Sequence, residues 1–170
     1  MHSQFSFSRD NNIKIFTAQS LDELTQLAEL SPRLRQHYNI HDDFEEPCQR
    51  LFNAIEPDSY IRPHRHLIVK RDELLIAIRG LMALVTFEND GQIKCVSRFG
   101  TEKYGSSVAA GTEVPAHIWH TVIALRPGSI LLEVKAGPFS LKHAKEFASW
   151  SPEENTDEAR AYFEQLRENI

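Results

Sequence analysis

The stretch Arg62-Pro63-His64-Arg65-His66 places two histidines one residue apart. Residues 59–62 before it are typical of a strand, in which positions i and i+2 face the same side. The two histidines can therefore present their imidazoles to one point, and imidazole is the commonest protein metal ligand. The pair predicts half of a metal site; the alternative is an exposed pair on a loop beside the two arginines.

Two further ligands are available downstream. Glu73 opens the next predicted strand, and His120 lies in the turn after Pro115 that enters another strand. Three neutral imidazoles and one carboxylate suit a divalent first-row metal such as Fe, Mn, Ni, Zn or Cu, without distinguishing between them. Four protein ligands leave positions open for Lewis-acid or water-activation chemistry. We expect His117 to be an exposed turn residue and not a fifth ligand.

The ligand spacing has a counterpart in a known superfamily. The order from His64 through Glu73 to Gly80 resembles the first cupin motif, and the order from Pro115 to His120 resembles the second. In cupins the two motifs lie on neighbouring strands of a small jelly-roll barrel. The resemblance implies that the histidine pair, Glu73 and His120 bind one metal ion inside such a barrel.

A longer likeness covers roughly residues 30–150. The segments that carry it are 47–54, 60–66, 119–122 and 132–139, and they resemble the WbuC-type cupin-fold metalloproteins. That family is met in bacterial surface-polysaccharide gene clusters, which implies a role in polysaccharide biosynthesis. One departure matters: six residues separate His66 from Glu73, where typical cupins have three or four. The loop 67–72 therefore decides whether Glu73 is a direct ligand or lies behind the ligands.

Composition limits the class of protein. A chain of 170 residues with 41% hydrophobic and 25% charged residues is an ordinary single globular domain. The net charge of −5 argues against a nucleic-acid or membrane-surface partner, since both need clustered Lys and Arg. Two cysteines without a CxxC spacing indicate reduced, partly buried thiols. No secretory signal or membrane-spanning run is evident, so we expect a cytoplasmic protein.

The fold class is read from the middle of the chain. Short apolar runs separated by turns predict strands at 59–63, 73–79, 81–88, 92–99, 107–110, 118–125 and 129–135. We predict a mainly β fold, a cupin-type double-stranded β-helix (small jelly-roll barrel) with flanking N- and C-terminal helices. Residues 1–57 would be an N-terminal extension, 58–139 the barrel and 140–170 a C-terminal helical extension, all in one structural domain.

Helix signals flank the strands. Ser20 and Glu23 form a capping box for a helix that ends near Leu30. Pro47 suits the first turn of a second, short helix running to residue 55, and Thr156 is a good N-cap for a C-terminal helix. Strand 118–125 is apolar on both faces, so its outer face needs the flanking helices or a second subunit. We therefore expect a homodimer.

Three further side chains are candidates for contact with a substrate. Tyr60 and Arg62 share the strand parity of the histidine pair, and Lys135 lies on the last predicted strand. These groups would orient a small polar or anionic metabolite by charge-assisted hydrogen bonds, or pair with one another to close the barrel's ends. The hypothesis is a metal-dependent isomerase or oxygenase acting on a possibly sugar-derived metabolite. The alternatives are a metal-assisted binding or accessory protein without turnover, and a metal-independent, epimerase-like cupin using His and Tyr as base and acid.

Overall fold

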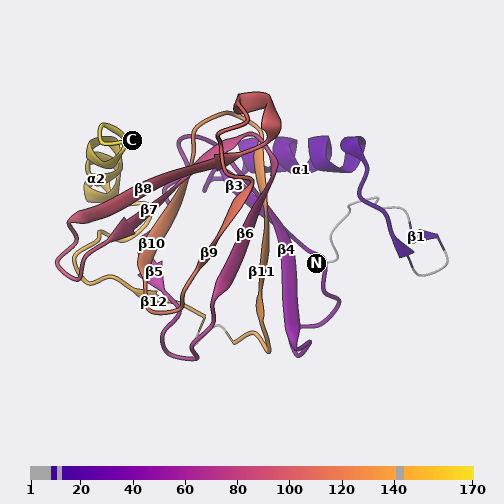
Figure 1. Cartoon of the computed structure of the whole chain (residues 1–170), viewed down its shortest axis with the longest axis horizontal. Coiled ribbons are helices and arrows are strands. Elements are labelled where there is room, and N and C mark those ends of the chain that lie inside the picture. Colours follow the sequence, from indigo (N-terminus) through magenta and orange to yellow (C-terminus); the bar gives the residue numbers. More distant parts are fainter. Residues whose placement is uncertain (1–8, 11–12, 141–143) are drawn as a thin grey trace.

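Two five-stranded sheets face one another in the computed structural model, which describes residues 9–10, 13–140 and 144–170 (Figure 1). The strand orders are β12-β5-β10-β7-β8 and β3-β4-β11-β6-β9, and all neighbouring strands are antiparallel. Apolar side chains from both sheets, among them Met82, Phe99 and Leu131, form the core between them. The predicted mainly β jelly-roll class with flanking helices is confirmed.

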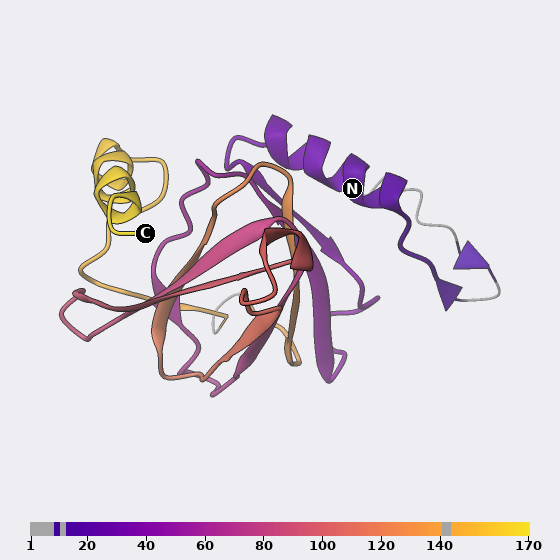
Figure 2. The ribbon, with the colours of Figure 1, turned by 45° about the horizontal axis from the view of Figure 1, so that its top comes forward.

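The elements have the following bounds. The first sheet contains β5 (His64–Arg65), β7 (Leu81–Phe87), β8 (Ile93–Gly100), β10 (Trp119–Ala124) and β12 (Glu146–Phe147). The second contains β3 (Arg35–Asn39), β4 (Cys48–Ile55), β6 (Glu73–Arg79), β9 (Gly111–Val114) and β11 (Ser129–Ala136). The helices are α1 (Ala18–Leu30), α2 (Asp157–Arg167) and the short 3-10 helix η1 (Glu102–Tyr104). A small hairpin of β1 (Arg9–Asp10) and β2 (Ile13–Lys14) projects from the body beyond α1 (Figure 2).

The two helices cover the outer faces of the two sheets. Leu24 and Ala28 of α1 have no exposed surface and belong to one apolar cluster with Phe52 of β4. Phe163 of α2 is buried in a second cluster with Val85 of β7 and other side chains of the first sheet. The apolar outer faces are thus covered by the chain's own helices. The homodimer stays a prediction.

The helix N-caps follow the capping rules, with one correction. Thr17, and not Ser20, caps α1: its hydroxyl accepts a hydrogen bond from the Ser20 amide at 3.1 Å. Ser20 is buried within the first turn, with its hydroxyl 2.8 Å from that of Thr17. Thr156 caps α2 as predicted, and its hydroxyl accepts from the Ala159 amide at 3.1 Å.

The predicted second helix is wrong, because Cys48–Ile55 is strand β4 between β3 and β11. Residues 51–55 are all buried, and an apolar run buried on both faces has no periodicity that separates strand from helix. The strand predicted at 107–110 is found at 111–114 instead, and β5 begins at His64 and not at residue 59. Strands β3 and β4, which lie within residues 1–57, belong to the second sheet.

Two other findings concern the expected class of protein. Cys48 and Cys95 are free, and both are exposed where partial burial was expected. Within the described residues, neither α1 nor α2 combines the length and the apolar character needed to cross a membrane.

Candidate metal centre

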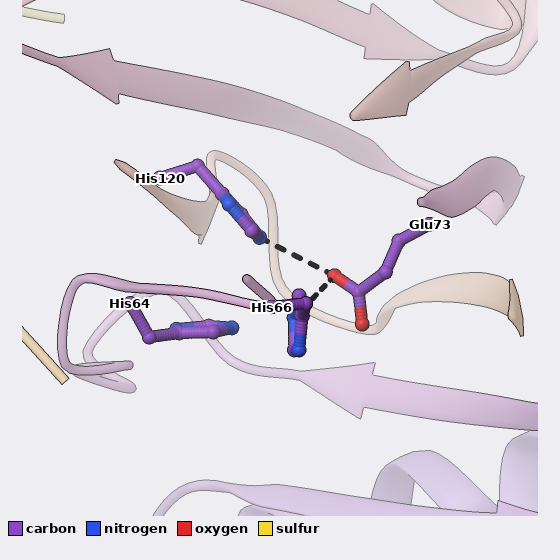
Figure 3. A group of neighbouring side chains, drawn as sticks. All are labelled: His64, His66, Glu73 and His120. Carbon is purple, nitrogen blue, oxygen red and sulfur yellow. Dashed lines mark ion pairs between the residues drawn. The ribbon is translucent and has the colours of Figure 1, made fainter. Parts of the chain in front are cut away.

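The structure brings four of the predicted site residues together inside the barrel (Figure 3). One ligand atom from each of His64, His66, Glu73 and His120 lies within 4.8 Å of the others. All four side chains are buried, with at most 4% of their surface exposed. A divalent ion bound at about 2.1 Å separates opposed ligands by about 4.2 Å, so the observed spread is close to that of a mononuclear site.

Strand pairing fixes the histidines. His64 of β5 lies opposite His120 of β10, and their ring centroids are 4.7 Å apart. His66 follows directly after β5, and its amide donates to the carbonyl oxygen of Ala116 at 2.9 Å. The two motifs, although more than 50 residues apart in sequence, thus meet on neighbouring strands.

The loop 67–72 brings Glu73 to the same point. The Arg71 amide donates to the His66 carbonyl oxygen at 3.3 Å, and the Ala116 amide donates to Oδ1 of Asp72 at 2.8 Å. The loop therefore hydrogen-bonds to residues of both motifs, and its additional residues lie between His66 and the start of β6. Glu73 stands at the start of β6 with its carboxylate facing His66 and His120 (Figure 3).

Each histidine is held in one tautomer by a backbone carbonyl. Nδ1 of His64 lies 2.9 Å from the carbonyl oxygen of Arg62. Nδ1 of His66 lies 2.6 Å from that of Ala144, and Nδ1 of His120 lies 2.9 Å from that of Ile118. A carbonyl oxygen can only accept, so Nδ1 carries a proton, and Nε2 is the nitrogen that faces the cluster and offers a lone pair when the ring is neutral. Such an outer hydrogen bond is what orients a metal-binding histidine.

The electrostatics keep the ligands in their binding forms. Burial, and next the charge of Lys145, lower the pKa of His64 well below its usual value, which favours the neutral imidazole. Burial alone would raise the pKa of Glu73, but Lys135 first, and then His120 and His66, outweigh it and hold that pKa well below its usual range. Glu73 is therefore a carboxylate.

The donor set fits a cation. Nε2 of His66 is buried without a hydrogen-bond partner among the described residues, yet it lies 2.9 Å from Oε2 of Glu73. Nε2 of His120 lies 3.3 Å from the same oxygen. Two imidazole nitrogens and a carboxylate oxygen thus converge on one point. A bound divalent ion would satisfy all of these atoms at once.

The other candidate residues fall in different places. Arg62 lines the cavity beside the cluster and donates to Oγ of Ser151 at 3.2 Å. Lys135 lies between Glu73, at 2.9 Å, and Glu133. Tyr60 is not brought to the site.

Tyr60 instead contacts the segment before α2. Its hydroxyl donates to the Pro152 carbonyl oxygen at 3.0 Å, and its ring packs against Tyr162 and Phe163. His117 is exposed on the turn before β10, as expected. His2 and His143 lie outside the described residues.

A cavity of about 920 Å³ shares two residues with the surroundings of the cluster, although none of the four cluster residues lines it. Lys135 and Ala144 line it and also contact the cluster, because Lys135 pairs with Glu73 and the Ala144 oxygen accepts from His66. Two further lining residues, Asn53 and Lys145, were not recognised as site residues from the sequence. Asn53 was assigned to a helix, and no local pattern marks Lys145.

Comparisons with known proteins give the fold and no activity. The profile of a family described as "Domain of unknown function (DUF6016)" matches residues 16–98, and no curated protein matches the chain. A solved protein designated SO0799 from Shewanella oneidensis is similar with a TM-score of 0.50 at 8% identity, over 65% of this chain and 72% of that one. The chain has a cupin-type fold. The WbuC-type likeness stays a prediction.

Two further solved structures share less of the geometry. KdgF from a Halomonas species has a TM-score of 0.47 at 16% identity, over 66% of this chain and 86% of that one. Oxalate decarboxylase from Bacillus subtilis has a TM-score of 0.49 at 17% identity, over 66% of this chain. This chain spans 27% of the length of the decarboxylase.

Proposed function

We propose that this protein is a mononuclear metalloenzyme that acts on a small polar metabolite held in the cavity beside the four-residue cluster. The observation that carries the proposal is the buried cluster of three histidines and Glu73, in which one ligand atom from each residue lies within 4.8 Å of the others. Three imidazoles and one carboxylate converging on one point are the ligand set of a mononuclear transition-metal site. A cavity of about 920 Å³ next to it provides room for a metabolite.

The roles of the chain's own residues follow from their contacts. His64, His66, His120 and Glu73 would hold a divalent transition metal, with Fe, Mn, Ni, Zn and Cu all compatible with the donor set. Such an ion, when bound, supplies Lewis-acid polarisation of a carbonyl or hydroxyl group. The barrel walls shield the cluster from water.

Lys135 holds the carboxylate of Glu73 in place, since its ammonium group lies 2.9 Å from Oε1. Arg62 lines the cavity, and its guanidinium group donates to Oγ of Ser151 and to the Ala148 carbonyl oxygen. We assign to Arg62 the orientation of the substrate. A sugar-derived substrate and a bacterial polysaccharide pathway are the part of the proposal that rests on the WbuC-type resemblance.

The placement of Tyr60 disfavours the metal-independent alternative. An epimerase-like mechanism needs a tyrosine hydroxyl across the substrate from a histidine base. The Tyr60 hydroxyl is bound to the Pro152 carbonyl oxygen, and Tyr60 does not line the cavity next to the cluster.

Elemental analysis of the purified protein tests the metal site. We expect about one equivalent of a first-row metal in the wild type and a loss of metal in His64→Ala and His120→Ala. His117→Ala is the matched control, because this exposed histidine lies three residues before His120 and should leave the metal content unchanged. A wild-type protein that stays metal-free after incubation with each of the five metals would overturn the proposal.

Turnover is tested separately. The metal-loaded protein is incubated with a bacterial metabolite extract, and consumption of a metabolite is followed by mass spectrometry, with His64→Ala as the inactive control. Metal-dependent consumption supports the enzyme. A metabolite that is retained by the protein and recovered unchanged would indicate binding without turnover.

A further inference from the structure

The cavity beside the cluster has more cations than carboxylates in its lining. Its five Lys and Arg side chains face three carboxylates. Each carboxylate pairs with one of the cations: Glu154 with Arg35, Glu153 with Arg62 at 3.6 Å, and Glu133 with Lys135. Arg33 and Lys145 are the cations left over, and Arg33 is exposed.

Lys145 is the inner one of these two. It is partly buried, and it forms no hydrogen bond or ion pair with any residue in the described part of the chain. Burial, and next the neighbouring charge of Lys135, lower the pKa of Lys145. For His64 and His37 burial is the larger cause of a lowered pKa, and the charge of Lys145 is the next. Lys145 lines the cavity and directly follows Ala144, whose carbonyl oxygen accepts from His66 of the four-residue cluster.

Two buried polar atoms in the same cavity also have no partner among the described residues. They are Oδ1 of Asn53 and Nε2 of His41, on side chains with 5% and 6% of their surface exposed. Asn53 lies opposite His37 in the β3–β4 register, and both residues line the cavity together with Lys145. A buried polar atom without a hydrogen bond is costly, and a ligand hydroxyl can satisfy it.

Apolar and aromatic side chains complete the lining. Phe44 and Phe139 pack against each other with ring centroids 5.1 Å apart, and both line the cavity together with Phe147 and Ile61. The apolar walls lower the local dielectric, which strengthens a charge-assisted hydrogen bond made inside them.

We infer that the cavity binds a polyhydroxylated carboxylate, whose anionic group contacts Lys145 and whose hydroxyl groups hydrogen-bond to Asn53 and His41. The inference rests on the proposed function for the assignment of the cavity as a substrate site, and it adds the substrate class and the two binding residues. Lys145 is the anion anchor, and Asn53 distinguishes a hydroxylated chain from an aliphatic one.

Isothermal titration calorimetry with three probes tests the assignment. D-gluconate carries both a charge and hydroxyl groups, D-sorbitol carries hydroxyl groups alone, and hexanoate carries a charge alone. We expect gluconate to bind the metal-free protein at least tenfold more tightly than either of the others, because one charge-assisted hydrogen bond contributes about a factor of ten or more.

The variants separate the two contacts. Lys145→Met should weaken gluconate binding about tenfold or more, and Lys145→Arg, which keeps the charge, should restore it to within about threefold of wild type. Asn53→Leu should weaken gluconate but not hexanoate. Lys103→Met, on the exposed η1 helix, is the control and should bind gluconate as the wild type does. Unchanged thermal midpoints would show that the variants are folded.

The inference is overturned if gluconate binds no more tightly than sorbitol, or if Lys145→Met binds it like wild type. Metal uptake, measured on the same preparations after incubation with each metal, keeps the two proposals apart. Lys145-dependent gluconate binding by a protein that takes up no metal would leave this inference standing and remove the metalloenzyme. Stoichiometric metal without a preference for gluconate would do the reverse.

Discussion

The ammonium group of Lys135 and the carboxylate of Glu73 form a buried ion pair across the β6–β11 register, with Nζ 2.9 Å from Oε1. Lys135 also contacts Glu133, so its charge is shared between two carboxylates. Since Lys135 occupies Oε1, the other oxygen, Oε2, is left facing His66 and His120. The lysine thus determines which carboxylate oxygen is presented to a metal ion.

Replacing Lys135 by methionine should weaken metal binding by about 10–100-fold, the usual effect of removing a group that orients a metal ligand. The carboxylate of Glu73 would lose its main cationic partner, so its pKa would rise and protons would compete better with the metal. Metal affinity is measured by competition with a chelator, with Lys103→Met as the control. An affinity in Lys135→Met equal to wild type would show that the ion pair plays no part in orienting Glu73.

The metal-free protein should lose stability when Glu73 is protonated. The pKa of Glu73 in the folded protein is held below its ordinary value of 4.5 by Lys135 and the histidines, which outweigh the effect of burial. The stabilisation is therefore full above pH 4.5 and is lost as the pH falls from there toward the folded-state pKa. We expect the free energy of unfolding, measured in urea from pH 6 to pH 3, to fall less steeply in Glu73→Gln than in wild type. Equal slopes in the two proteins would contradict this assignment.

Metal binding should stabilise the fold through His66. At a free metal concentration about 1,000 times the dissociation constant, a site absent from the unfolded chain adds about 4 kcal/mol. The thermal midpoint of the metal-free wild type should therefore rise when the metal is restored, and that of His66→Ala should not. Differential scanning calorimetry with and without metal measures both. A similar rise in His66→Ala would place the bound ion elsewhere.

Part of the fold could be predicted because the relevant signals are local. The apolar run and turn that define β6 and β7, and the Thr156 cap of α2, lie within a few neighbouring residues. Strand β4 was missed because it is buried on both faces, which removes the alternation that distinguishes a strand. Its assignment as a helix also hid Asn53, which points into the cavity only because β4 is a strand.

The site shows the same division. The spacing of the histidines along the sequence predicts His64 and His120 as ligands of one metal ion. The pairing of β5 with β10 brings these two residues opposite each other, as a shared metal ion requires. The parity argument failed for Tyr60 because regular strand geometry begins only at His64, so the alternation of faces does not extend back to it. Lys145 enters the cavity because β12 pairs with β5, about 80 residues earlier in the chain, and no local pattern encodes a contact of that range.

Gly80 should tolerate no side chain. Its φ of +77° is unfavourable for other residues, and a Cβ there would clash with Oγ of Ser129 and lie 2.8 Å from the Cα of Ser129. Gly80→Ala should lower the free energy of unfolding by about 1–3 kcal/mol from backbone strain, and by more from the clash with β11. Gly105→Ala is the control, because Gly105 has a φ of +119° but no atom near its Cβ position. Equal losses in the two variants, measured in urea, would mean that Ser129 moves aside at no cost.

Phe163→Ala tests whether α2 alone covers the outer face of the first sheet. Phe163 has 6% of its surface exposed in the cluster that contains Val85 and Ile123, so its truncation should cost about 3–5 kcal/mol. Glu164→Ala, at an exposed position of the same helix, should change the free energy of unfolding by no more than about 0.5 kcal/mol.

The free energies of unfolding of both variants are measured by urea unfolding at two protein concentrations. If a second subunit also covered this face, the wild-type midpoint would rise with protein concentration and the loss in Phe163→Ala would be smaller at the higher one. Midpoints independent of concentration would mean that the helix alone is the cover.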